Sequence, residues 1–229
     1  MRTKLLIFLG IVVVGAGAVF YLLRPLKAPT VSTGEASEQT PEITISPEQA
    51  AASNRYQLNS TNSEATFAIG EVLLGQKQTT TGSTKQVSGE VVVNKEQPKN
   101  SQIGTIRINA RTFKTDNTRR DSTIGRFILK SEEDANEFIV FKPTSITGLP
   151  TTLPTNPIEF KITGDLSIAG TTRPVVFEAT AQLADNALAG NAMTTIKRSQ
   201  FNISVPLSQS VASVDDEVVL TISFIAESK

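Results

Sequence analysis

The sequence has no cysteine, no histidine and no tryptophan. The first two absences exclude disulfides, thiolate redox chemistry, zinc sites built from Cys or His, and every Ser-His or Cys-His nucleophile. An excess of charge of one sign is also lacking, because 22 Lys and Arg balance 22 Asp and Glu. Since no net field attracts a charged polymer, we expect no nucleic-acid partner.

Paired carboxylates remain a route to acid–base catalysis in a chain without histidine. The acidic clusters lie at residues 132–134 and 215–217. Both fit solvated caps or turns, and neither follows the Asp-x-Asp-x-Asp-Gly order of a calcium loop. We therefore predict that the protein is not an enzyme and holds no metal or cofactor.

Residues 5–23 carry no charge and lie between Arg2 and Lys4 on one side and Arg24 and Lys27 on the other. As a helix this segment would be roughly 28 Å long, close to the thickness of a bilayer core. We predict an uncleaved transmembrane anchor at residues 1–24, with the remaining chain outside the cytoplasm in the cell envelope. The alternatives are a cleaved signal peptide, with its small residues at 16–18, and a buried core helix.

Residues 25–54 are rich in Pro, Thr, Ser, Glu and Ala, without a sustained apolar period. This composition predicts a flexible linker. The linker would keep a domain at residues 55–229 near a membrane surface.

The segment after the linker has the period-two alternation of half-buried strands. The clearest runs are residues 158–168, 175–183 and 218–226. Less regular candidates are residues 66–73, 86–93, 102–110, 137–146 and 187–196. About eight strands with short connections predict a large antiparallel sheet, which avoids exposed edges most completely by closing into a barrel.

One interruption of the strand pattern, near residues 116–134, is helical. Asp116 or Thr118 could cap a helix there, with Asp121 completing a capping box. Ser131 with Asp134 could begin a second short helical turn.

Four motifs resemble the YceI-like family, whose members are also described as polyisoprenoid-binding. They are NTRRDSTI at 117–124, GDLSIAGTTRPVVFEA at 164–179, IKRSQFNI at 196–203 and DEVVLTISFIA at 216–226. The resemblance implies an eight-stranded, lipocalin-like antiparallel β-barrel, closed at one end, with an apolar interior that holds an isoprenoid or another lipid. Histidines common in the family are replaced here by residues such as Thr123 and Ala169, so no histidine role transfers.

Inward-facing apolar side chains are the candidate lipid contacts. An eight-stranded barrel can also be filled by its own side chains, so these residues could be packing alone. The absence of Trp and the small residues Gly164, Ala179 and Ala181 are compatible with a hollow interior. The candidates are Phe67, Ile69, Val91, Ile106, Phe141, Phe160, Ile162, Leu166, Ile168, Phe177, Ile222 and Phe224.

Arg119, Arg120 and Arg126 lie in the helical interruption. A guanidinium presents a planar fork of donors, so these residues could bind the anionic head group of a lipid. The favoured interpretation is that Arg120 and Asp121 pair with neighbours and fasten the insertion to the sheet.

These observations predict a membrane-tethered extracytoplasmic protein that binds an isoprenoid or fatty-acid-like chain. The alternative is a filled barrel without a ligand, acting as an envelope interaction or stress-response module.

Overall fold

The computed structural model describes residues 41–46, 52–58, 60–184, 187–207 and 211–228. The chain divides into two units, residues 1–31 and 32–229, and every described residue lies in the second. The predicted anchor at residues 1–24 and most of the predicted linker lie outside the described residues. Within the described residues, no helix has the length and apolar character needed to cross a membrane.

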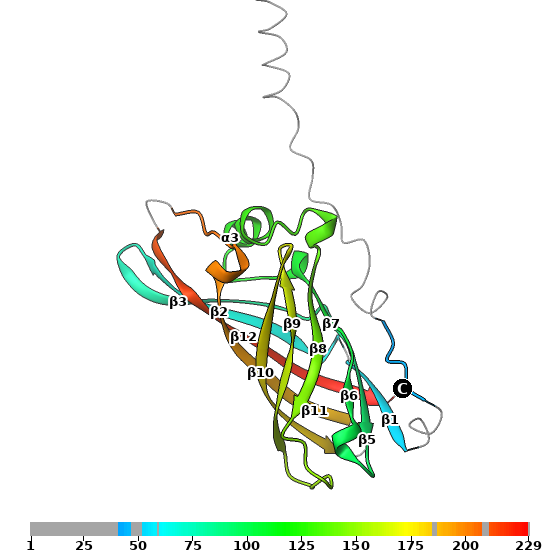
Figure 1. Ribbon diagram of the computed structural model, residues 1–229. Helices are drawn as coiled ribbons and strands as arrows, with labels where there is room; N and C mark the ends of the chain where they lie inside the picture. The colour runs from blue at the N-terminus through cyan, green and yellow to red at the C-terminus, as the bar shows by residue number, and fades with distance from the viewer. Residues whose placement is uncertain (1–40, 47–51, 59, 185–186, 208–210, 229) are drawn as a thin grey trace, which may run out of the picture. The chain divides into compact units, whose positions relative to one another are not determined.

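The described residues of the second unit form one antiparallel sheet of twelve strands with short helical segments (Figure 1). The strands are β1 (Ser53–Leu58), β2 (Glu64–Leu73), β3 (Gln76–Thr84), β4 (Val87–Ser88), β5 (Glu90–Asn94), β6 (Gln102–Ile103), β7 (Ile106–Asn109), β8 (Phe138–Thr147), β9 (Ile158–Ile168), β10 (Thr171–Ala184), β11 (Ala187–Lys197) and β12 (Val211–Ser228). The helical segments are η2 (Pro98–Asn100), η3 (Ala110–Thr112), α3 (Thr118–Thr123), η4 (Ile124–Ile128), η5 (Asp134–Asn136) and η6 (Arg198–Phe201).

The hydrogen-bonded path runs β4-β7-β8-β9-β10-β11-β12-β1-β5-β6. The path begins at β4 and reaches β5 near its other end. Only Gly89 separates these two strands in the chain, so both ends of the path lie on the same chain segment. Strands β2 and β3 extend from β12 as a further pair. The all-β antiparallel prediction is therefore confirmed as a curled sheet, although the structure divides it into more segments than the expected eight.

The predicted alternation places the core on the concave side of this sheet. In β9, Ile162, Leu166 and Ile168 are buried, whereas Glu159, Lys161 and Asp165 of the same strand are exposed. Strand β10 repeats the pattern with Phe177, Ala179 and Ala181. Inward side chains of the other strands complete one continuous apolar cluster.

The hairpin between β9 and β10 turns in two residues. Ala169 and Gly170 both have positive φ, 47° and 77°, while Ile168 pairs with Thr171. Two positive φ values define the type I′ geometry that matches the twist of a hairpin. Pro174 lies farther along β10, where pairing with β11 has not yet begun, so its missing N–H costs no ladder bond on that side.

The helical interruption is present, but its cap differs from the prediction. Asn117, rather than Asp116 or Thr118, accepts hydrogen bonds from the backbone N–H groups of Arg119 and Arg120. Asp121 instead accepts from the backbone and hydroxyl of Thr115, both at 2.8 Å. The second helical turn is η5, which begins at Asp134 without a side-chain cap from Ser131.

Residues before position 55 also contact the sheet. Strand β1 starts at Ser53, and Ile43 contacts the sheet from within the predicted linker. The Ile43 N–H donates to Glu90 at 2.7 Å, and its carbonyl accepts from Arg55 at 2.8 Å. A salt bridge of 2.8 Å joins Arg55 to Glu90, whose side chain is almost wholly buried. This contact fixes part of the predicted linker against β1 and β5.

Candidate functional site

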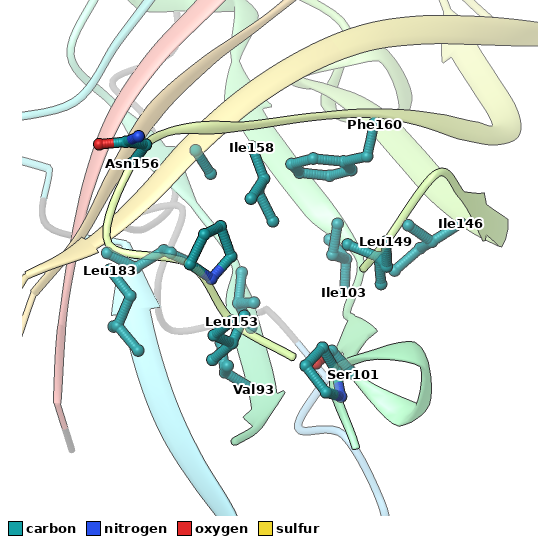
Figure 2. A pocket seen from close by; sticks show the side chains of 15 residues that line it. Val93, Ser101, Ile103, Ile146, Leu149, Leu153, Asn156, Ile158, Phe160 and Leu183 are labelled. Carbon is teal, nitrogen blue, oxygen red and sulfur yellow. The ribbon is translucent and has the colours of Figure 1, made fainter. Parts of the chain in front are cut away.

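Two small apolar cavities lie inside the curled sheet. The larger, of about 60 Å³, is seen in Figure 2, where Ile158 and Phe160 of β9 lie across from Ile103 and Val93. The loop between β8 and β9 forms part of its wall. It is lined by Val91, Val93, Pro98, Ser101, Ile103, Ile146, Leu149, Leu153, Pro154, Asn156, Ile158, Phe160, Ala181, Leu183 and Leu188.

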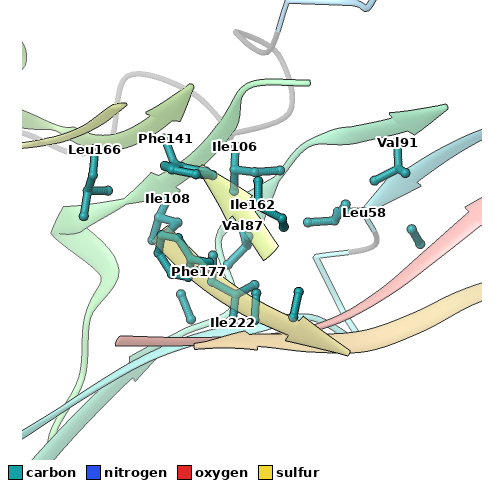
Figure 3. Packing of buried hydrophobic residues seen from close by; sticks show 14 of the residues in the cluster. Leu58, Val87, Val91, Ile106, Ile108, Phe141, Ile162, Leu166, Phe177 and Ile222 are labelled. Atoms are coloured by element: carbon teal, nitrogen blue, oxygen red, sulfur yellow. The ribbon is translucent and has the colours of Figure 1, made fainter. Parts of the chain in front are cut away.

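The smaller cavity, of about 50 Å³, lies among the buried residues that Figure 3 shows. The rings of Phe141 and Phe177 meet there edge to face, with centroids 4.9 Å apart. Val91 and Ile103 line both cavities and so form the boundary between them. The complete lining is Leu58, Val91, Ile103, Ile106, Phe141, Ile162, Phe177, Ala192, Ile222 and Phe224.

The sizes of the cavities decide how a lipid could fit. An apolar cavity of about 150 Å³ holds benzene, and drug-sized ligands occupy pockets of about 300–1,000 Å³. Each cavity here is much smaller than either value. A lipid chain therefore needs side chains such as Val91 and Ile103 to move apart so that the two spaces join.

Neither cavity is lined by a charged side chain, and the polar residues that line the larger one are Ser101 and Asn156. Burial lowers the pKa of Arg107, and the charge of Glu137 acts in the opposite direction. Arg107 lines neither cavity, and its guanidinium lies 4.2 Å from the centroid of the Phe138 ring. The lining can therefore exclude water and hold an apolar chain, but it offers no charged group to one.

The predicted lipid contacts divide between the two cavities and the surrounding core. Val91, Ile106, Phe141, Ile162, Phe177, Ile222 and Phe224 line the smaller cavity, and Phe160 joins Val91 in the larger one. Phe67, Ile69, Leu166 and Ile168 line neither. Leu166 and Ile168 are core residues, and the ring of Phe67 packs against Phe113 at 5.6 Å. Their role as ligand contacts stays a prediction.

The loop between β8 and β9, at residues 148–157, contributes lining residues that strand alternation could not identify. It contains three prolines and connects β8 to β9 at the end of the sheet opposite α3 (Figure 1). Leu149 and Leu153 are half-buried and face the larger cavity. The amide of Gln182 donates to the Thr155 carbonyl at 2.8 Å and fastens the loop to β10. The sequence signal that could have identified these lining residues was the recurrence of leucines in a Pro-rich loop.

The three candidate head-group arginines line neither cavity. Arg120 forms ion pairs with Asp116 and, at 3.4 Å, with Glu71 of β2. Arg126 donates to Glu132 at 2.7 Å. The Arg120–Glu71 pair joins the insertion to β2, whereas the Arg126–Glu132 pair lies within the segment before β8.

A second fastening, which the sequence did not indicate, centres on Arg111 after β7. Its buried guanidinium contacts Glu137 at 2.9 Å and Asp134 at 2.6 Å, and its Nε donates to the Ser131 carbonyl at 2.6 Å. Asn109 also donates to Glu137, at 3.2 Å. This network holds the segment before β8 in place. In the described part of the chain, no group of three or more acidic side chains is placed to bind a metal ion.

With the curled sheet and its apolar interior described, comparison with known proteins identifies the family. A model of the YceI-like domain matches residues 56–226. The chain belongs to the YceI-like family. No curated relative matches the sequence.

Several solved structures share the fold of this chain. BcnA from Burkholderia cenocepacia is 16% identical, with a TM-score of 0.59 over 73% of this chain and 98% of its own. A polyisoprenoid binding domain from Saccharophagus degradans, implicated in plant cell wall breakdown, is 11% identical, with a TM-score of 0.59 over 76% and 98%. The YceI protein of Campylobacter jejuni is 20% identical, with a TM-score of 0.52 over 65% and 84%. At these identities the likeness shows the shared fold.

Proposed function

We propose that this protein binds the apolar chain of an isoprenoid or fatty-acid-like lipid inside the curled sheet, for storage, carriage or sequestration. The observation that carries the proposal is the pair of uncharged cavities that share Val91 and Ile103 in a YceI-like domain. The likeness to a polyisoprenoid binding domain supports the class of ligand. The role is binding rather than catalysis, and the sheet would act as an eight-stranded lipocalin-like barrel.

The energy for binding comes from removing the chain from water. Each buried CH₂ contributes about 0.8 kcal/mol, so ten or more methylenes offset the ordering of the chain and the movement of side chains. Because the cavities are small, the space between them must widen, and this requires side chains such as Val91 and Ile103 to move apart. The loop at residues 148–157 covers the larger cavity with few hydrogen bonds, which favours local opening there.

The proposal includes a location. Residues 1–24 would anchor the protein in the cell membrane by a single span, and residues 25–54 would link this anchor to the extracytoplasmic domain. Such a tether would keep the lipid-binding site near a lipid source. Sequencing the N-terminus of the protein from membrane fractions tests this point, because a mature chain beginning near Val19 would contradict an uncleaved anchor.

Native mass spectrometry of the full chain tests lipid binding. The protein is compared as purified, after organic extraction, and after addition of a long-chain lipid such as hexadecan-1-ol. We expect a single lipid adduct that extraction removes and addition restores. A bare mass in all three spectra would refute the proposal.

A matched pair of variants on β11 locates the binding site. Ala192 lines the smaller cavity, whereas its neighbour Met193 faces solvent. We expect Ala192→Leu to reduce lipid binding and Met193→Leu to leave it unchanged. Circular dichroism checks that both variants fold. Equal binding by both folded variants would place the lipid elsewhere.

The small volumes favour a second candidate function, in which the interior stays filled by side chains and the protein is an envelope interaction or stress-response module. This candidate predicts that no lipid binds to the wild-type chain at any concentration used in the mass spectra. The same experiment therefore separates the two functions.

A further inference from the structure

Tyr56 on β1 is the largest fully buried side chain of the described residues. It pairs in register with Val91 of β5, and directly opposed residues of antiparallel strands project on the same face. Val91 lines both cavities, and Leu58, two residues after Tyr56 on the same strand face, lines the smaller one. Tyr56 itself lines neither cavity, but its backbone lies beside Val91, at the boundary between them.

The hydroxyl of Tyr56 has no hydrogen-bond partner among the described residues. A buried donor without an acceptor costs free energy that phenylalanine would avoid in the same volume. Unsatisfied polar groups inside native proteins are few, and this one belongs to a residue paired with Val91 of both linings, which points to an acceptor that arrives from outside. A lipid that moves Val91 aside would enter the space beside its strand partner Tyr56.

The lining restricts the chemistry of the acceptor. Because no charged side chain lines either cavity, an ionised carboxylate or phosphate would lie there without a counter-charge. A carbonyl or hydroxyl oxygen accepts a hydrogen bond from a phenol without that penalty. The arginines that could hold an anion lie outside the lining.

We propose that the Tyr56 hydroxyl donates a hydrogen bond to an uncharged oxygen of the bound lipid, so that the protein selects oxygenated, uncharged chains. This inference rests on the proposed lipid-binding function. It assigns Tyr56 a polar contact at the boundary of two cavities that no charged side chain lines.

A comparison of two lipids of equal length tests this contact in the full chain. Hexadecan-2-one and hexadecane are competed against a fluorescent fatty-chain probe, and the ratio of their dissociation constants is measured for wild type and Tyr56→Phe. We expect the variant to weaken binding of the ketone relative to the alkane by about fivefold, the equivalent of about 1 kcal/mol. Tyr21→Phe, at the other tyrosine of the sequence, is the matched control and should leave the ratio unchanged.

The outcomes separate this inference from the function on which it rests. If both lipids bind and the ratio is the same in wild type and Tyr56→Phe, the hydrogen bond is refuted while lipid binding stands. If neither lipid binds to wild type, the proposed function itself fails. The lipid-free variant adds an independent readout, because losing an unsatisfied hydroxyl should raise the thermal midpoint. A lower midpoint would mean that the hydroxyl already has a partner in the protein, which would overturn the inference.

Discussion

Replacing Phe177 by alanine tests whether the smaller cavity is both structural core and lipid site. The ring of Phe177 is only 3% exposed and packs edge to face against Phe141. It also lines the smaller cavity, so its removal both deletes a core contact and enlarges the proposed site.

The expected cost follows from this burial. Removing a buried phenylalanine ring destabilises a protein by about 3–5 kcal/mol. For a domain of this size each kcal/mol lowers the thermal midpoint by about 2–4 °C, so Phe177→Ala should lower it by about 6–20 °C. Differential scanning calorimetry or the circular dichroism of the strands measures this shift.

Lipid should then restore more stability to the variant than to wild type. A ligand at about a hundred times its dissociation constant adds about 2.7 kcal/mol. The space left by Phe177 adjoins the smaller cavity, so a chain can enter there with less movement of side chains. We therefore expect a larger lipid-induced rise of the midpoint in Phe177→Ala.

Phe127→Ala is the control, because Phe127 is 63% exposed on η4. Its midpoint should change by no more than about 2 °C, since exposed substitutions are within about 0.5 kcal/mol. An unchanged midpoint in Phe177→Ala would refute the burial of the ring. Equal lipid-induced shifts in Phe177→Ala and wild type would refute the placement of the chain beside it.

Two further predictions concern charged groups outside the cavities. Hydrogen bonds from the hydroxyl and backbone N–H of Ser199 lower the pKa of Asp216. The stability that this carboxylate contributes is therefore present above about pH 4 and is lost as acid protonates the carboxylate. Ser199→Ala should raise that pKa toward its ordinary value, as measured by an NMR titration of the carboxyl carbon, and an unchanged pKa would contradict the role of the hydroxyl. Arg55→Met should cost about 3 kcal/mol or more in urea unfolding because it leaves the buried Glu90 carboxylate without its cationic partner, although the Ile43 N–H still donates to it. A cost no larger than that of a typical surface substitution would contradict the buried pair.

The fold was largely predictable because strand alternation is a strong local signal where one face of a sheet is buried. Residues 158–168 alternate without a break and form β9 as a single strand. Strands β1 and β3 escaped prediction for different reasons. Strand β1 is short, and β3 contains the polar run 76–81 without an apolar face.

The candidate site was predictable only in part, because alternation gives the direction of a side chain and not its distance from a cavity. Leu166 faces inward as predicted, yet other side chains pack over it and it lines neither cavity. Leu153 lines the larger cavity from a loop, where no periodicity applies. The unpartnered hydroxyl of Tyr56 depends on contacts between strands distant in sequence, which a single sequence does not reveal.

The central claim, that a lipid chain lies inside the sheet, is tested most directly by methyl NMR of the full chain during titration with hexadecan-2-one. The methyl groups of Ile106, Ile162 and Ile222 line the smaller cavity and should shift as lipid is added. Leu74 and Leu207 are exposed, at 77% and 62%, and should not shift. Shifts confined to these exposed leucines, with the three isoleucines unchanged, would place the lipid on the surface and contradict the account.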